Sequence, residues 1–170
     1  MTTANDLLID GFDRVRETVA AAVEGLDEDR LAYRPDPDAN SIAWLVWHLC
    51  RVQDDHVAEV AGGGQLWTSG GWVERFGLPF DVGATGYGHG SSDVARVRAG
   101  AELLAGYQDA VHAATVDYVR TLRDEDLPRV VDERWDPPVT LGVRLVSVLG
   151  DTMQHAGQAS YVRGLVERRP

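Results

Sequence analysis

The chain has 170 residues, of which 44% are hydrophobic and 25% are charged. Both values are typical of a globular protein, and we expect residues 1–170 to form a single domain with a sizeable core. The 16 basic and 27 acidic residues give a net charge of −11. This charge argues against binding to nucleic acid or to an anionic membrane, because both require a basic surface.

The sequence also carries no signal for a membrane or an export pathway. No apolar run reaches the ~18 residues of a transmembrane helix. The first residues, MTTANDLLIDGFDRVRE, lack the basic and apolar regions of a signal peptide. The single cysteine, Cys50, excludes an internal disulfide and suits a reducing compartment. We therefore expect a cytoplasmic protein.

The first predicted element is an amphipathic helix over residues 4–25. Its apolar residues recur at intervals of three or four, with charged residues between them, so one face meets a core. Gly25 marks its expected end. Residues 26–39 contain two prolines and several acids, which predicts a loop with one short turn around residues 27–33.

A second helix is predicted from Asn40 or Ser41, either of which can cap it, to about Ala61. His48 lies inside its apolar stripe. Asp55 and His56 follow two turns later on a similar face. The stripe itself consists of Ile42, Leu45, Val46, Leu49, Val52 and Val57.

Residues 62–90 form an unusual segment with ten glycines and five aromatic residues. A loop of this length in a small domain is often functional or mobile. A disordered linker rarely holds so many aromatic side chains. We expect the segment to pack over the helices and form part of a pocket wall, with one helical turn over residues 72–77.

A third helix is predicted over residues 91–123, where apolar residues keep a spacing of three to four. Residues 124–139 form a second connector, in which Pro137-Pro138 blocks helix formation and residues 130–135 suit a short extended piece. Thr140 then caps a fourth helix that runs to about residue 166.

Four amphipathic helices without a convincing sheet predict an all-α four-helix bundle. The connectors after the second and third helices are long enough for crossovers. They allow the simple up-down order as well as up-down-down-up, and we expect the latter.

The fourth helix carries the strongest chemical signal, since Asp151 and His155 are four residues apart and share one face. Their neighbours are mostly apolar, and a buried polar pair must be hydrogen-bonded or coordinated. His48 is the best third partner. Two histidines and one carboxylate with an open fourth position are typical of catalytic zinc, although iron, nickel or manganese suit the same ligands.

Other interpretations of these residues exist. Asp151 and His155 can form a hydrogen-bonded pair without a metal, and His48 can be an ordinary core histidine. His56 is a reserve metal ligand. Either Asp55 or His56 can orient His48, whereas we expect Asp54 on an exposed helix face.

Two further residues on the fourth helix are candidate catalytic groups. Arg144 lies seven residues before Asp151 on nearly the same face, where it can bind a substrate carboxylate or pair with Asp151. Gln158 lies seven residues after Asp151, again on that face, and can orient a thiol or substrate.

Four remaining residues have weaker signals. Tyr87 and His89 can close over the site from the glycine-rich segment, although a solvated loop is the expected state of His89. His112 is expected to be structural. Cys50 follows His48 by two residues and should point away as a buried, inert thiol.

The motif WLVWHL, followed about a hundred residues later by DTMQHAGQASYVRG, resembles the DinB-like metal-binding four-helix superfamily. The resemblance implies metal ligands at His48, Asp151 and His155, followed by the Gly157-Gln158 pair. The superfamily includes the metal domain of mycothiol-dependent maleylpyruvate isomerase and S-transferases that use mycothiol or bacillithiol. Many members have His where this chain has Asp151, and the isomerase has Glu there and carries a further C-terminal domain, so we do not expect isomerase activity.

The resemblance implies a divalent-metal-dependent thiol S-transferase, with zinc as the first choice of metal. Its partners would be a low-molecular-weight thiol such as mycothiol and a small electrophile, and we expect a homodimer. The alternatives are a non-catalytic, metal-stabilised binding or stress-response protein, and a metal-dependent hydrolase that uses bound hydroxide.

Overall fold

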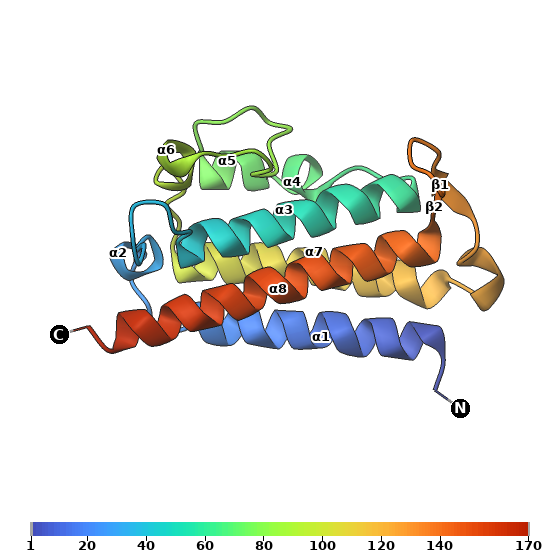
Figure 1. Cartoon of the computed structure of the whole chain (residues 1–170), viewed down its shortest axis with the longest axis horizontal. Helices are drawn as coiled ribbons and strands as arrows, with labels where there is room; N and C mark the ends of the chain where they lie inside the picture. Colours follow the sequence, from blue (N-terminus) through green and yellow to red (C-terminus); the bar gives the residue numbers. More distant parts are fainter. Residues whose placement is uncertain (1, 170) are drawn as a thin grey trace.

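Four long helices carry the fold in the computed structural model, which describes residues 2–169 (Figure 1). α1 packs against α7 and α8, and α3 packs against the same two helices from the opposite corner. α3 and α7 run in one direction and α1 and α8 in the other, so the bundle has the expected up-down-down-up order. The four helices are α1 (Ala4–Val23), α3 (Ile42–Ala61), α7 (Ala101–Thr121) and α8 (Leu141–Glu167).

Side chains at the predicted cap positions form N-cap hydrogen bonds in the two helices that carry the site. The Ser41 hydroxyl accepts a hydrogen bond from the backbone N–H of Trp44, and Thr140 accepts one from Val143. Each bond satisfies a donor that has no partner within the helix. α3 ends at Gly62, which adopts the left-handed conformation that glycine tolerates best.

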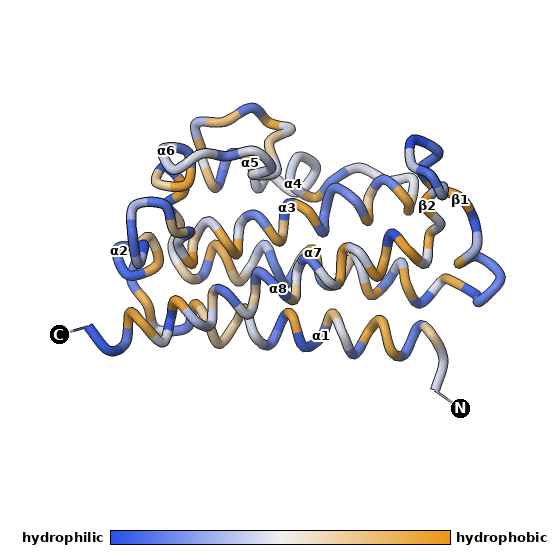
Figure 2. The backbone as a smooth tube through the Cα atoms, viewed as in Figure 1, coloured by the Kyte–Doolittle hydropathy of each residue, from blue (hydrophilic) through white to orange (hydrophobic). Residues whose placement is uncertain are grey.

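The core lies between the four helices, where apolar residues gather along the facing sides (Figure 2). α3 is its central element, since every residue from Ile42 to Arg51 is buried. A helix that is buried on all sides needs cover beyond its bundle neighbours. The segment between α3 and α7 supplies this cover by folding back along the outer side of α3 (Figure 1).

That covering segment contains short helices and a tight aromatic cluster. The predicted turn near residue 72 is α5 (Trp72–Phe76), and it is preceded by α4 (Leu66–Ser69). Trp67, Trp72 and Phe76 are buried against Tyr107 of α7. The predicted packing of this segment over the helices is therefore confirmed. The short turn predicted around residues 27–33 is likewise present, as α2 (Glu28–Leu31).

The third helix differs from its predicted extent. Residues 91–123 were expected to be one helix, but α6 (Ser91–Val94) ends early and α7 begins only at Ala101. Val94, Val97 and Ala99 are all buried, so an irregular stretch satisfies the same apolar spacing. Gly100 stands before α7 with an extended backbone, where its low helix propensity favours a break.

A small hairpin closes one end of the bundle, between the end of α3 and the start of α8 (Figure 1). After a short 3₁₀ turn, η1 (Asp124–Asp126), the strand β1 (Val130–Asp132) pairs antiparallel with β2 (Val139–Thr140) across a bulge. The predicted extended piece is thus confirmed in part. None of the helices between residues 2 and 169 combines the length and apolarity that a membrane crossing requires.

Candidate metal centre

Three side chains from two packed helices converge near the middle of the bundle. His48 comes from α3, and Asp151 and His155 come from α8. One candidate ligand atom from each residue lies within 4.8 Å of the other two. The imidazole centroids of His48 and His155 are also 4.8 Å apart. The structure therefore brings together the three residues that the sequence singled out as metal ligands.

Each of the two imidazoles makes a hydrogen bond through its Nδ1 atom. This bond determines which ring nitrogen is available to a metal ion. Nδ1 of His48 lies 2.6 Å from the backbone carbonyl oxygen of Thr85, and Nδ1 of His155 lies 3.2 Å from Oε1 of Gln158. Both partners only accept, so each Nδ1 carries the proton. Each Nε2 then keeps a free lone pair, as is usual for metal-binding histidines.

The surroundings of the Asp151 carboxylate show whether a cation fits between the three side chains. Its Oδ1 lies 3.6 Å from Nε2 of His155, which is longer than a hydrogen bond. Its Oδ2 is buried and has no hydrogen-bond partner among residues 2–169. A buried carboxylate oxygen without a partner is destabilising. A divalent cation between Asp151 and the two Nε2 atoms would remove this deficit, so the residues present fit a metal ion.

The protonation states follow from the surroundings of each group. Burial lowers the pKa of His48, which favours its neutral form. The neighbouring Asp151 carboxylate raises the pKa of His155, and His155 in turn lowers the pKa of Asp151. Asp151 is therefore ionised at neutral pH, and a metal ion would compete with protons for Nε2 of His155.

The glycine-rich segment fixes the ring of His48. Gly86 has φ +93°, and a Cβ there would lie 2.7 Å from Nδ1 of His48. Only glycine allows the Thr85 carbonyl to approach the imidazole this closely. On the other side, Trp44 stacks on the same ring with centroids 4.6 Å apart. The segment expected as a pocket wall thus holds a candidate ligand in place.

The residues proposed to orient His48 have other partners. The carboxylate of Asp55 accepts a hydrogen bond from Gln65, and His56 lies against Arg144. His56 is also outside the group of converging ligand atoms. Neither of these two candidates orients His48, because a backbone carbonyl takes that role.

Asp54 was wrongly placed on an exposed face, since it is only 5% exposed. Its carboxylate accepts hydrogen bonds from the backbone N–H groups of Leu66 and Trp67 and from the Tyr107 hydroxyl. The loop after α3 folds back and places the first turn of α4 against Asp54. A pattern of residues along one helix cannot reveal such a partner.

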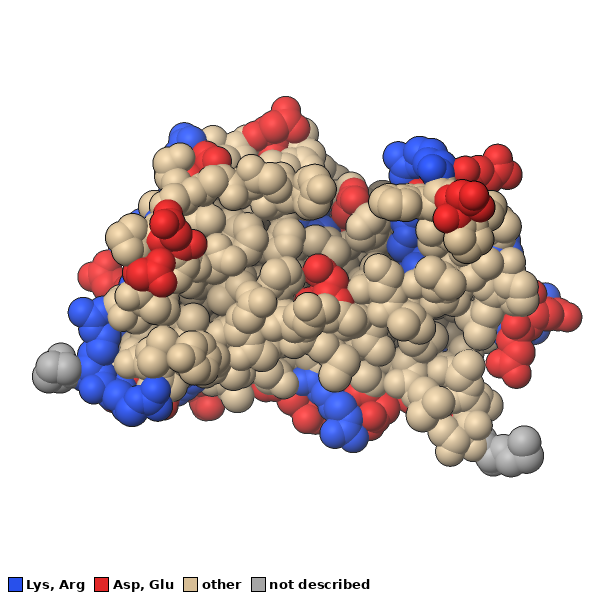
Figure 3. Space-filling model, in the orientation of Figure 1, with Lys and Arg blue, Asp and Glu red and all other residues tan. Residues whose placement is uncertain are grey.

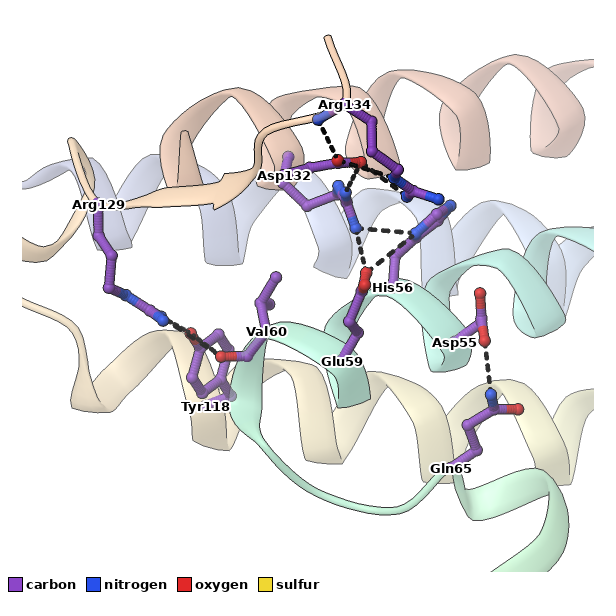
Figure 4. Close-up of polar contacts among 10 residues, drawn as sticks. Asp55, His56, Glu59, Val60, Gln65, Tyr118, Arg129, Asp132 and Arg134 are labelled. Carbon is purple, nitrogen blue, oxygen red and sulfur yellow. Dashed lines mark hydrogen bonds and ion pairs between the residues drawn. The ribbon is translucent and has the colours of Figure 1, made fainter. Parts of the chain in front are cut away.

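Arg144 forms ion pairs away from the converging ligands. Within the part of the chain that the structure describes, its partners are Glu59 of α3 and Asp132 of β1 rather than Asp151. Of the two roles considered for Arg144, the pairing with Asp151 is not present. Arg134, beside Asp132, holds the pKa of Asp132 well below its usual range, with a smaller effect from Arg144. Figure 4 shows this network, with the labelled side chains of His56, Glu59, Asp132 and Arg134 directed toward one another.

His89 and Tyr87 of the glycine-rich segment differ in their packing, and His89 is not in the solvated loop that was expected for it. Nδ1 of His89 accepts a hydrogen bond of 3.2 Å from Nε1 of Trp44, and its ring stacks on Trp47. His89 is therefore packed beside the site rather than solvated. Tyr87, in contrast, is 94% exposed.

His112 and Cys50 have the roles that the sequence suggested. Nε2 of His112 lies 2.6 Å from the Asp13 carboxylate and links α7 to α1. The Cys50 thiol is buried and donates to Oε1 of Gln108. Burial raises the pKa of the Cys50 thiol well above its usual range, so it stays protonated and inert.

Comparisons with known proteins agree with this arrangement. A conserved protein from Enterococcus faecalis has a similar crystal structure, with a TM-score of 0.92 and 32% sequence identity over 99% of this chain and 100% of that chain. No curated protein matches the sequence. The mycothiol-S-transferase family matches residues 7–168, nearly the whole chain. The chain therefore belongs to the mycothiol-S-transferase family, a DinB-like family, as the motifs around His48 and His155 had indicated.

Proposed function

We propose that this protein is a divalent-metal-dependent S-transferase that joins a mycothiol-type thiol to a small electrophile. One observation supports this most: three open ligand atoms, from His48, Asp151 and His155, lie within 4.8 Å of one another in a member of a thiol-transferase family. We infer that residues 1–170 act as one metal-binding domain.

The proposed ligands are Nε2 of His48, Nε2 of His155 and the carboxylate of Asp151. Three protein ligands leave a position open for a substrate, whereas closed structural zinc sites use four. Zinc is the first choice, and nickel, iron and manganese suit the same donors. A divalent ion held there would keep a coordinated thiol deprotonated at neutral pH, although a free thiol has a pKa near ~8.5.

The protein's own groups position the reactants. The Thr85 carbonyl and Gln158 hold the two imidazoles, and Trp44 limits access of water to His48. We assign Gln158 as a positioning residue because its contact is to His155. In the reaction, the thiol sulfur uses an electron pair to bond to the electrophilic carbon. The leaving group departs with its own bonding pair, and the thiol proton passes to solvent.

Cobalt substitution tests the proposal. Protein purified without a His-tag should contain about one divalent ion per chain, and cobalt should replace it. Adding mycothiol or a simple thiol should then produce a sulfur-to-cobalt charge-transfer band. It should also release about one proton per site below the pKa of the free thiol. An unchanged spectrum at saturating thiol, with cobalt bound, would reject the transferase.

Two further properties belong to the same proposal. We infer a cytoplasmic location, because a thiol co-substrate and the free Cys50 both suit a reducing compartment. The homodimer stays a prediction, to be checked by sedimentation equilibrium. Exposed apolar side chains on α8, Met153 and Tyr161 among them, offer one surface for it.

A further inference from the structure

A pocket of about 350 Å³ opens beside the candidate metal centre. It lies between the hairpin and the helices α3 and α8, and Asp151 forms part of its wall. Figure 3 shows this face hollowed between two raised parts, the segment over α3 and the hairpin. Neither His48 nor His155 lines the pocket. The pocket therefore reaches the candidate centre through Asp151 alone.

The floor of the pocket leads along α8 to the candidate ligands. Val143, Ser147 and Asp151 all line it, and His155 continues the same series at four-residue intervals. Each residue of this series is a neighbour of the next on the helix surface, so the series leads stepwise from the pocket toward His155. The distance along the axis from Val143 to Asp151 is about 12 Å at 1.5 Å per residue. A molecule in the pocket can thus place one end beside Asp151 and the other under the hairpin.

The positive charges in the pocket are already neutralised. Arg144 pairs with Glu59 and Asp132, and Arg134 binds Asp132 through two hydrogen bonds of 2.9 and 2.8 Å (Figure 4). An anionic ligand would gain less from guanidinium groups whose charge is already balanced by carboxylates. It would also meet a chain with a net charge of −11. The pocket is therefore poorly suited to an anion.

The remaining surface of the pocket favours an apolar body. Trp135 of the hairpin lines it with 66% of its surface exposed, and Val139 of β2 and Val143 of α8 line it too. An exposed tryptophan beside valines offers a flat apolar surface on which an uncharged ring can stack. The polar side chains nearby mostly bind one another, so they add few new contacts for a polar ligand.

We propose that this pocket binds the electrophile, and that it selects an uncharged compound with a flat apolar or aromatic body. The reactive carbon lies toward Asp151, and the body lies against Trp135. The inference rests on the proposed function, which supplies the thiol at the three ligands. It replaces the expectation that Arg144 binds a substrate carboxylate.

Two matched probes test the selection by charge. 1,3-Dinitrobenzene is neutral, and 3,5-dinitrobenzoate is the same ring with a carboxylate. Neither has a good leaving group, so equilibrium dialysis against the purified full-length protein measures binding alone. We expect a dissociation constant at least about tenfold lower for the neutral probe, or about 1.4 kcal/mol. Equal or tighter binding of the benzoate, or no saturable binding of the neutral probe, would overturn the proposal.

Two neighbouring residues on α8 test the location. Ser147→Phe places a ring in the pocket from an exposed position, whereas Val146→Phe puts the same ring on a side chain that is 62% exposed and outside the lining. We expect Ser147→Phe to weaken binding of 1,3-dinitrobenzene at least tenfold, and Val146→Phe to leave it unchanged. Should Ser147→Phe fail to fold by circular dichroism, Trp135→Ala replaces it, with an expected loss of at least threefold. Wild-type affinity in the folded variant contradicts the location.

The cobalt spectrum separates this inference from the proposed function. Ser147 is not a candidate ligand, so Ser147→Phe should bind cobalt and show the thiol band like the wild type. If the wild type lacks the band but still binds 1,3-dinitrobenzene in a manner that Ser147→Phe abolishes, the transferase is rejected and the neutral-ligand pocket stands. If the band is present and Ser147→Phe binds the probe normally, the transferase stands and the pocket assignment is wrong.

Discussion

Two polar clusters bridge α3 and α8, and they differ in where their positive charge comes from. In the first cluster, Arg144 supplies a guanidinium to Glu59 and Asp132. In the second, Asp151 and two imidazoles face one another, and Oδ2 of Asp151 has no partner in the described chain. His56 follows His48 by two turns of α3, yet only His48 is among the three residues whose ligand atoms converge in the second cluster.

The difference shows how similar residues acquire different roles. A carboxylate that is paired with a built-in cation is satisfied, so the first cluster ties the hairpin to the bundle. A carboxylate without one is incomplete until a cation arrives from solution. The second cluster is therefore the one suited to a metal ion, even though both contain histidine and acidic side chains.

Removing a ligand of the second cluster should have the largest effect. His48→Ala, Asp151→Ala and His155→Ala are each expected to weaken metal binding more than about 100-fold, beyond the usual effect of outer contacts. His56→Ala is the matched control and should bind metal like the wild type. Competition with a chromophoric chelator measures all four. Normal binding in the three variants, with loss in His56→Ala, would move the site to the first cluster.

The second-largest effect on metal affinity is expected at Gly86, which lies against the His48 ring. Gly86→Ala forces a methyl group toward Nδ1 of His48, and we expect metal affinity to fall about 10- to 100-fold. Gly88→Ala is the control, because Gly88 also has a positive φ, of +78°, but a Cβ there would meet nothing within 4 Å. Both variants carry a similar backbone strain of about 1–2 kcal/mol. Equal metal affinities in the two variants would show that the contact with His48 is unimportant.

The first cluster should affect stability rather than metal affinity. Arg144→Met removes the built-in cation, and we expect a loss of about 2 kcal/mol in the free energy of unfolding. The loss stays moderate because Arg134 still pairs with Asp132 and Glu59 is half-exposed. Arg14→Met is the control, since its pair with Asp10 is exposed to solvent and its loss should change the free energy of unfolding far less.

Urea unfolding of the metal-free proteins gives these values, and chelator competition gives the metal affinity. Arg144→Met should keep its affinity within about threefold, because the guanidinium is not a ligand. A metal affinity that falls as steeply as in the ligand variants would show that the two clusters act as one.

The smallest effect is expected at Gln158, which orients His155 from an exposed position. Gln158→Ala should weaken metal binding about tenfold or less, because water can replace the lost acceptor. Gln154→Ala is the control, since its side chain binds the backbone carbonyl of Gly150 instead. Calorimetric titration resolves this difference, and identical affinities would remove Gln158 from the site.

Much of the bundle could be predicted from spacing along the chain. Ser41 and Thr140 cap α3 and α8, as expected, and the intervals that place Asp151 and His155 on one face hold in the structure. These are local properties, because a helix repeats with a fixed period. The spacing of Val94 and Val97 was misleading for the same reason, since both are buried outside a regular helix.

The partners of the site could not be predicted in this way. The group that orients His48 is the backbone carbonyl of Thr85, and a carbonyl has no signature in a sequence pattern. One partner of Arg144 is Asp132, which reaches it only because the hairpin folds against α8. Such contacts depend on how connectors fold over helices, and connectors lack the periodicity that defines helices.

The state of Cys50 has a consequence for a protein that is proposed to handle electrophiles. Such a protein is exposed to alkylation by its own substrates, and a thiolate is the side chain that reacts most readily. Cys50 is the only cysteine, and it lies two residues from His48. Its burial and its hydrogen bond to Gln108 keep the sulfur protonated and out of reach. If the proposed reaction takes place, the fold separates the thiol that is consumed from the thiol of Cys50, and so protects the protein from self-inactivation.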